Sequence, residues 1–171
     1  MNIKNNIEKV RDFALKRLIE IIGVLLLLFS VLILIALIGY SPNDPNFIYP
    51  ENQEINNFLG INGSIGADFL LQSIGLISYF LPITLVFLSV TIVYHKNLLE
   101  IVNSLFYIVC YSIVGAVFLT QFYKEAFFLI INGNGGFIGN YFYNEIFFKI
   151  ANLNIKISYY LQILIFIALF L

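Results

Sequence analysis

The sequence predicts an all-α integral membrane protein, a bundle of four transmembrane helices with its N-terminus inside the cell and short amphipathic helices beside it. Of its 171 residues, 60% are hydrophobic and 11% are charged, and the mean hydropathy is +0.91. A soluble domain is about half apolar and about a quarter charged. The apolar residues also gather in long uncharged stretches, and Lys and Arg are concentrated before the first of them.

The apolar stretches give the number of crossings. A helix needs about 20 residues to cross roughly 30 Å of hydrocarbon. The predicted spans cover residues 20–40, 69–94, 101–123 and 152–171. The fourth is the shortest, because its uncharged part from 157 onward reaches only about 22 Å. The sequence stops while it is still hydrophobic, so we expect the front part of a longer protein or a truncated gene.

The distribution of basic residues sets the orientation, because cytoplasmic segments carry the excess of Lys and Arg. Residues 1–19 form a cytoplasmic basic segment, and residues 20–171 form the membrane domain. The outer loop 41–68 has no Lys or Arg, whereas the second outer loop, 124–151, departs mildly from the rule. Five basic residues precede the first span: Lys4, Lys9, Arg11, Lys16 and Arg17.

Two segments outside the spans have amphipathic spacing. In residues 3–18, apolar residues recur at helical intervals among basic ones, which favours a short helix on the anionic inner leaflet. A disordered tail with a few basic anchors is the alternative. Residues 137–151 predict a second helix on the outer leaflet, with Glu145 and Lys149 as an i,i+4 pair.

A hexapeptide ends the first span: Tyr40, Ser41, Pro42, Asn43, Asp44 and Pro45. The two prolines remove backbone donors, while Ser, Asn and Asp favour turns through side-chain hydrogen bonds. The pattern therefore predicts an abrupt stop to the helix.

No motif in the sequence combines the residue types used for catalysis, metal binding or phosphate binding. No Cys/His cluster indicates a metal site, and no charged residue lies in the middle of a span, which disfavours pumps and intramembrane enzymes. Gly60, Gly63 and Gly66 lack the Lys of a phosphate-binding loop. We interpret them as a turn into a helix, with Asp68 near that helix N-terminus. Pro82 predicts a kink within the second span.

These features together resemble the four-span N-terminal membrane region of FtsK/SpoIIIE-type bacterial DNA translocases. The likeness begins with the hexapeptide and covers nearly the whole chain. It continues through Phe58-Leu59-Gly60, Gly63, Gly66-Ala67-Asp68, Gly75, Tyr79 and Leu81-Pro82, and then Gly135-Gly136 and Gly139. The structural or interaction candidates are Tyr40, Ser41, Pro42, Asn43, Asp44, Pro45, Gly60, Gly66, Asp68, Pro82, Gly135 and Gly136.

The resemblance implies a membrane-anchoring and oligomerisation domain of a translocase that acts in chromosome segregation and cell division. It implies the bacterial inner membrane at the septum as location, and the lipid bilayer, further copies in a hexamer and division-site proteins as partners. ATP, Mg and DNA are implied only for a motor domain absent from this chain. No catalytic, cofactor-binding or metal residue is expected here. The alternative is a small membrane transport or channel component, with Pro82 and the Gly-rich segment 132–136 as moving parts.

Overall fold

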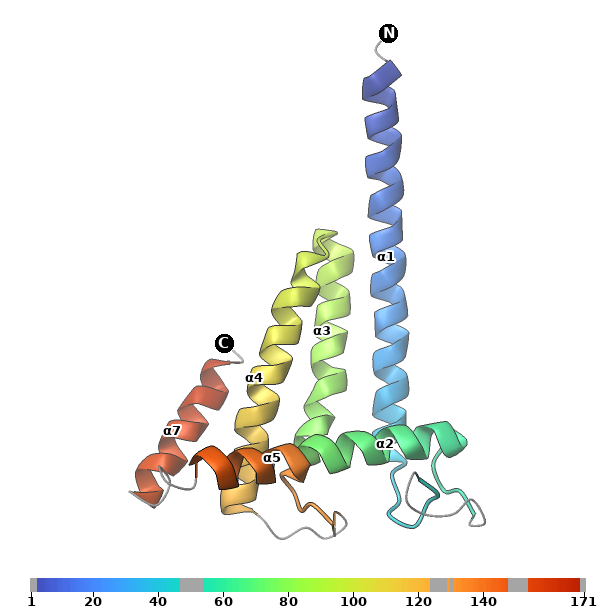
Figure 1. Ribbon diagram of the computed structural model, residues 1–171. Coiled ribbons are helices and arrows are strands. Elements are labelled where there is room, and N and C mark those ends of the chain that lie inside the picture. The colour runs from blue at the N-terminus through green and yellow to red at the C-terminus, as the bar shows by residue number, and fades with distance from the viewer. Residues whose placement is uncertain (1–2, 47–53, 124–128, 130, 148–153, 170–171) are drawn as a thin grey trace.

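The structure, a computed structural model, describes residues 3–46, 54–123, 129, 131–147 and 154–169. Every regular element in this part of the chain is helical, as the sequence predicts. In Figure 1, α1, α3, α4 and α7 stand roughly upright, and α2 and α5 lie across their lower ends. The elements are α1 (Ile3–Ile38), α2 (Gly60–Ile74), η1 (Gly75–Tyr79), α3 (Phe80–His95), α4 (Leu99–Phe122), α5 (Gly136–Phe142), η2 (Tyr143–Phe147, a π-helical turn) and α7 (Ile155–Ala168).

Helix α1 has 36 residues, which is about 54 Å of helix. It continues without a break from the basic segment into the apolar stretch, so residues 3–18 do not form the separate surface helix expected there. The sequence has neither Gly nor Pro between Ile3 and Ile22, and nothing interrupts the backbone hydrogen bonds there. In Figure 1 the N-terminal part of α1 projects well past the ends of α3 and α4.

One face of α1 packs against α3. Residues of this face recur at alternating intervals of four and three, the spacing of a coiled-coil seam. Gly23 allows close approach, since a Cβ there would lie 2.5 Å from Val93 Cγ2. Ser30 is fully buried and donates to the Pro82 carbonyl oxygen at 2.6 Å. The buried or half-buried members of the seam are Ile19, Gly23, Leu26, Ser30 and Ile33. Leu37 continues the spacing but lies in the core cluster with Ala67 and Leu71 of α2.

Residues 69–94 do not form one straight helix, because the chain turns a corner at Gly75. This residue has φ +65° and ψ −149°, a conformation that L-residues with a Cβ avoid. α2 ends there and lies across the bundle, η1 makes the corner, and α3 stands upright (Figure 1). Pro82 is the third residue of α3, where its missing N–H is not needed for the helix. The bend expected at Pro82 is therefore located at Gly75–Tyr79.

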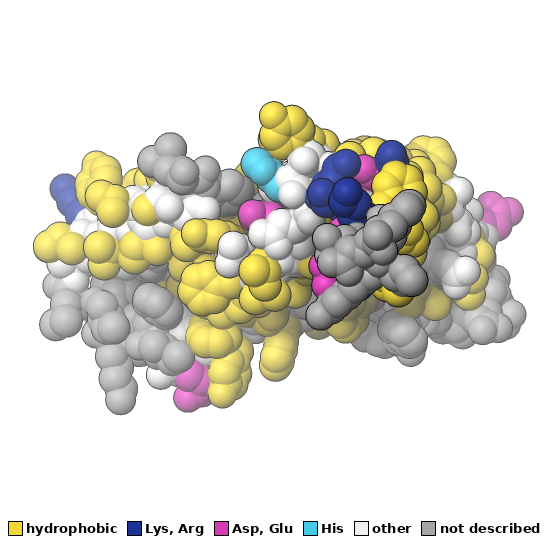
Figure 2. All heavy atoms as spheres, turned by 90° about the horizontal axis from the view of Figure 1, so that it is seen from above, with side chains coloured by type: hydrophobic (Ala, Val, Ile, Leu, Met, Phe, Trp, Pro, Cys, Tyr) yellow, Lys and Arg dark blue, Asp and Glu magenta, His cyan; other side chains and the backbone are white. Residues whose placement is uncertain are grey.

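Helices α3 and α4 form an antiparallel pair. Lys96, in the left-handed region, ends α3, and its N–H bonds to Ile92 O at 2.8 Å. The Lys96 Nζ lies 2.6 Å from Glu20 Oε1, and Arg17 Nη1 lies 2.5 Å from Glu20 Oε2. Seen from above in Figure 2, Lys and Arg side chains gather beside acidic ones, with the single histidine a short way off. These contacts connect α1 to the α3–α4 connection.

Helix α7 packs on α4 and is capped by Asn154, whose Oδ1 accepts from the N–H groups of Lys156 and Ile157. Among the described residues, three helical stretches are long and apolar enough, by length and composition, to cross a membrane: Ile7–Ile38, Leu99–Phe122 and the bent stretch Gly60–His95, which comprises α2, η1 and α3. α7 is apolar but has only 14 residues, about 21 Å of helix. The fourth crossing, predicted for residues 152–171, stays a prediction.

Candidate functional site

The residues that follow α1 form a polar junction with the loop before α2. Asp44 lies at its centre and is 1% exposed. Its Oδ1 accepts from the backbone N and the side-chain Nδ2 of Asn56, at 3.0 and 2.9 Å. Its Oδ2 accepts from the backbone N of Asn57 at 2.8 Å. The carboxylate thus closes the loop between the hexapeptide and α2 with three charge-assisted hydrogen bonds.

Two further side chains connect this loop to the helices. Asn57 donates from Nδ2 to the Ala36 carbonyl in the last turn of α1, and its Oδ1 accepts from Leu59 N. Ser64 in α2 is 2% exposed and donates to the Pro45 carbonyl at 2.8 Å. The end of α1, the hexapeptide and the start of α2 are therefore held as one unit.

Tyr40 lies two residues beyond α1 and bonds to the side of α2. Its hydroxyl donates to Asp68 Oδ1 at 3.3 Å, and Gln72 Nε2 donates to the same oxygen at 3.4 Å. The Tyr40 side chain is half-buried, and its phenol is protonated and a hydrogen-bond donor at neutral pH. Asp68 is the ninth residue of α2, not near its N-terminus as the sequence interpretation placed it.

A second junction forms where the corner at Gly75 meets the glycines before α5. The N–H of Leu76 donates to Asn134 O at 2.9 Å. A Cβ on Gly75 would lie 1.9 Å from that same oxygen, and a Cβ on Gly136 would lie 2.5 Å from Gly75 N. Gly135 and Gly139 similarly face the Ala116 carbonyl of α4, since a Cβ on either would lie 2.4 Å from its oxygen. Backbone therefore contacts backbone where α2, α4 and α5 meet.

The remaining candidates occupy simpler positions. Ser41 and Pro42 are half-buried parts of the turn, and Asn43 is exposed. Gly60 is the first residue of α2 and has φ +65°. A Cβ added to it would have no other heavy atom within 4 Å. Gly66 is within α2 and also has open space around it. The structure thus brings together Tyr40 with Asp68, and Pro45 with α2, but their role in binding other molecules stays a prediction.

Sequence reasoning missed the partners of these residues. Asn56 and Asn57 hold the Asp44 carboxylate, and Ser64 holds the Pro45 carbonyl. An Asn before a helix start is a recognised local signal for a turn, but nothing in the sequence assigns its partner 12 or 13 residues away. A third polar contact was also missed: Gln121 Oε1 in α4 accepts from Ser158 and Gln162 of α7, at 3.2 and 2.6 Å.

The arrangement has the chemistry of a structural junction. Its acceptors are occupied by protein donors, and no group of three or more His, Cys, Asp or Glu that would suit a metal ion occurs among the described residues. The Lys149 half of the expected Glu145–Lys149 pair lies outside the described residues.

A family model of the 4TM region of DNA translocase FtsK/SpoIIIE matches residues 15–171. The chain belongs to this family. It is thus the membrane-anchoring region of an FtsK/SpoIIIE-type translocase, and this 4TM domain is not itself catalytic. No solved structure matches the chain. The FtsK/SpoIIIE match spans both junctions, from the seam on α1 to the apolar helix α7.

Removing the Tyr40 hydroxyl tests the contact between the end of α1 and α2. Tyr40→Phe is expected to destabilise this FtsK-type domain by about 1 kcal/mol, the net worth of one hydrogen bond. Thermal unfolding in detergent, followed by circular dichroism, measures the change. Tyr94→Phe, at an exposed position on α3, is the matched control. Equal melting temperatures for the two variants would show that the Tyr40 bond to Asp68 contributes nothing.

Proposed function

We propose that this region anchors and oligomerises a DNA translocase at the division septum of the bacterial inner membrane, where the full protein moves DNA during chromosome segregation. The match to the FtsK/SpoIIIE 4TM region over residues 15–171 carries the proposal. The motor that hydrolyses ATP with Mg and grips DNA would follow this region, and no residue here is assigned to either.

The layout of the helices supports this arrangement. In Figure 1 the C-terminal end of α7 points to the same side as the N-terminal end of α1. That side carries the basic residues of α1, which the positive-inside rule assigns to the cytoplasm. A motor following α7 would therefore lie in the cytoplasm, beside the chromosome.

Exposed apolar side chains on α1 support self-association. Ile7, Val10 and Phe13 lie on the part of α1 that projects beyond α3 and α4, and they are 64%, 68% and 61% exposed. Apolar side chains on a projecting helix are stabilised when another surface covers them. In the proposed hexamer that surface would be α1 of a second copy, and division-site proteins would bind elsewhere on the domain.

The transport alternative is less well supported. It depended on Pro82 and the Gly-rich segment 132–136 as moving parts. Pro82 lies in the first turn of α3 with its carbonyl bonded to Ser30, and the Gly-rich segment is bonded to Leu76 through Asn134 O. The anchoring role requires no moving part.

A fluorescent fusion to this chain tests the septal location in dividing cells. We expect a band at midcell that is clearly brighter than the lateral membrane. The same fluorophore on an unrelated single-span anchor is the control for extra membrane at the septum. Uniform labelling of a fusion that is full length on a gel would contradict the proposal.

A further inference from the structure

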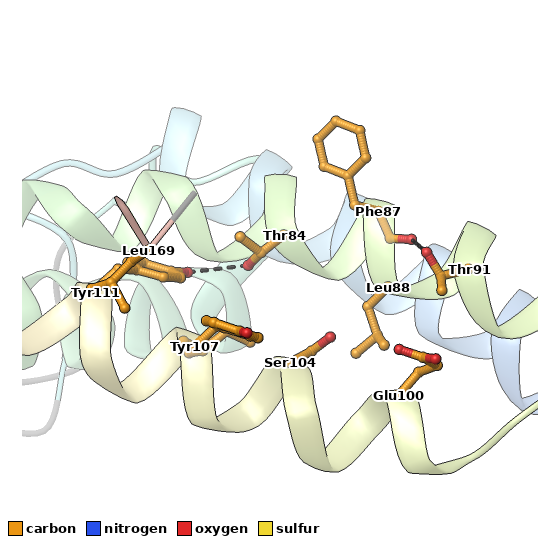
Figure 3. A pocket seen from close by; sticks show the side chains of 10 residues that line it. Thr84, Phe87, Leu88, Thr91, Glu100, Ser104, Tyr107, Tyr111 and Leu169 are labelled. Atoms are coloured by element: carbon orange, nitrogen blue, oxygen red, sulfur yellow. Dashed lines mark hydrogen bonds between the residues drawn. The ribbon is translucent and has the colours of Figure 1, made fainter. Parts of the chain in front are cut away.

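A cavity of about 390 Å³ lies between α3 and α4 and reaches Leu169 beyond α7. Figure 3 shows Glu100 at one end, Tyr111, Thr84 and Leu169 at the other, and Ser104 between them. Glu100 and Tyr111 are eleven residues apart on α4, which is about 16 Å along the helix. The volume is within the range of about 300–1,000 Å³ typical of sites for single small molecules.

The end at Glu100 is charged. Glu100 is in the first turn of α4, just before the predicted span 101–123, so it lies at the level of the lipid head groups. Nearby, Glu20 is paired with Arg17 and Lys96. Glu100 has no ion pair among the described residues. A half-buried carboxylate that faces a cavity at this level favours a cationic group.

Beyond Glu100 the cavity is lined by hydroxyl groups and apolar side chains. Thr91, which lines the cavity, donates to its own helix at Phe87 O, 2.9 Å away. Ser104 and Tyr107 add two hydroxyl groups on the α4 side. At the deep end Thr84 donates to Leu81 O and lies 3.1 Å from the Tyr111 hydroxyl, so these polar groups already have partners. Ile108 and Leu169 add apolar side chains beyond Ser104, whereas Leu88 lies near Glu100 (Figure 3).

We propose that this cavity binds a phospholipid with a primary ammonium group, phosphatidylethanolamine. The ammonium would donate to Glu100, the phosphate would accept from the Ser104 and Tyr107 hydroxyls, and the first part of an acyl chain would lie against Ile108 and Leu169. The quaternary ammonium of phosphatidylcholine has no N–H group to donate to Glu100. The anionic head group of phosphatidylglycerol would be repelled by the Glu100 carboxylate. The proposal depends on the membrane placement of the helices and not on the septal role.

Native mass spectrometry of the full chain tests the proposal, after incubation in micelles with phosphatidylethanolamine, phosphatidylcholine or phosphatidylglycerol. A hydrogen bond to a charged group corresponds to about tenfold or more in affinity. We therefore expect one phosphatidylethanolamine to be retained about tenfold more than either other lipid. Equal retention of all three lipids, or preference for phosphatidylglycerol, would overturn the assignment.

Variants locate the bound lipid. Glu100→Gln is expected to reduce retention of phosphatidylethanolamine to the level of phosphatidylcholine, while Glu54→Gln, at an exposed loop residue outside the cavity, leaves it unchanged. Ser104→Leu keeps the carboxylate but fills the middle of the cavity, and it should also abolish the preference. Circular dichroism establishes that each variant is folded. Retention unaffected by both cavity variants would place the lipid elsewhere and refute the site.

Discussion

Replacing Asp44 with Ala is expected to destabilise the domain by about 2 kcal/mol or more, because it removes a charged acceptor from one buried and two part-buried hydrogen bonds. The donors are the backbone N–H groups of Asn56 and Asn57 and the side-chain amide of Asn56. The loop residues they belong to bind to the end of α1 through Asn57 Nδ2, so the loss extends to the attachment between α1 and α2. Thermal or denaturant unfolding in detergent gives the free energy change.

Two companion variants identify the cause. Asn43→Ala changes the exposed neighbour in the same turn and should leave the stability within about 0.5 kcal/mol. Asp44→Asn keeps one acceptor oxygen but places an NH₂ group toward a donor, so an intermediate loss is expected. If Asp44→Ala unfolds at the same temperature as Asn43→Ala, the carboxylate does not hold the junction.

Replacing Gly75 with Ala is expected to have an effect of similar size, by backbone strain and steric overlap together. The residue has φ +65° and ψ −149°, and its new methyl group would lie 1.9 Å from Asn134 O, a backbone atom that has no flexible side chain to yield. Strain in such a conformation costs about 1–3 kcal/mol on its own. The bond from Leu76 N to Asn134 O would be lost as the two segments separate.

Two other glycines separate these causes. Gly60 has φ +65° with nothing within 4 Å, so Gly60→Ala measures strain alone. Gly66 is inside α2 with open space around it, and Gly66→Ala should stabilise the helix by about 0.5–1 kcal/mol. The expected order of melting temperatures is therefore Gly66→Ala, wild type, Gly60→Ala and Gly75→Ala, from highest to lowest. If the Gly75→Ala protein is as stable as the Gly60→Ala protein, the backbone at Gly75 does not contact the backbone at Asn134.

The sequence predicts the helices better than their directions. Hydropathy and length predict helices at 20–40 and 101–123, where α1 and α4 lie, and Pro42 marks the end of α1 because a proline cannot continue the hydrogen bonds. Hydropathy does not distinguish a helix that crosses the bilayer from one that lies parallel to its surface. Residues 69–94 are therefore predicted as one span. The corner depends on a single residue, Gly75, whose conformation the apolar pattern does not reveal.

The junctions show the same limit at the level of side chains. The turn-forming character of Asp44 follows from its residue type, since a short carboxylate readily accepts backbone N–H bonds. Its partners are 12 and 13 residues along the chain, and they are fixed only when α2 packs against α1. The sequence did not predict that the basic segment and the first span form one continuous helix. The reason is that amphipathic spacing is equally typical of a helix on the membrane surface and of a helix that projects from it.

The distribution of these contacts has a mechanical consequence. The Asp44 and Gly75 junctions both lie at the end of the domain away from the N-terminus of α1 (Figure 1). At the opposite end, the described polar link between α1 and the end of α3 is the partly exposed pair of Glu20 and Lys96, and such pairs add about 0–1 kcal/mol. A pull on the N-terminal end of α1 would therefore be resisted there mainly by the apolar packing of Ile19 and Leu26 on α3, and by buried hydrogen bonds only at the far end.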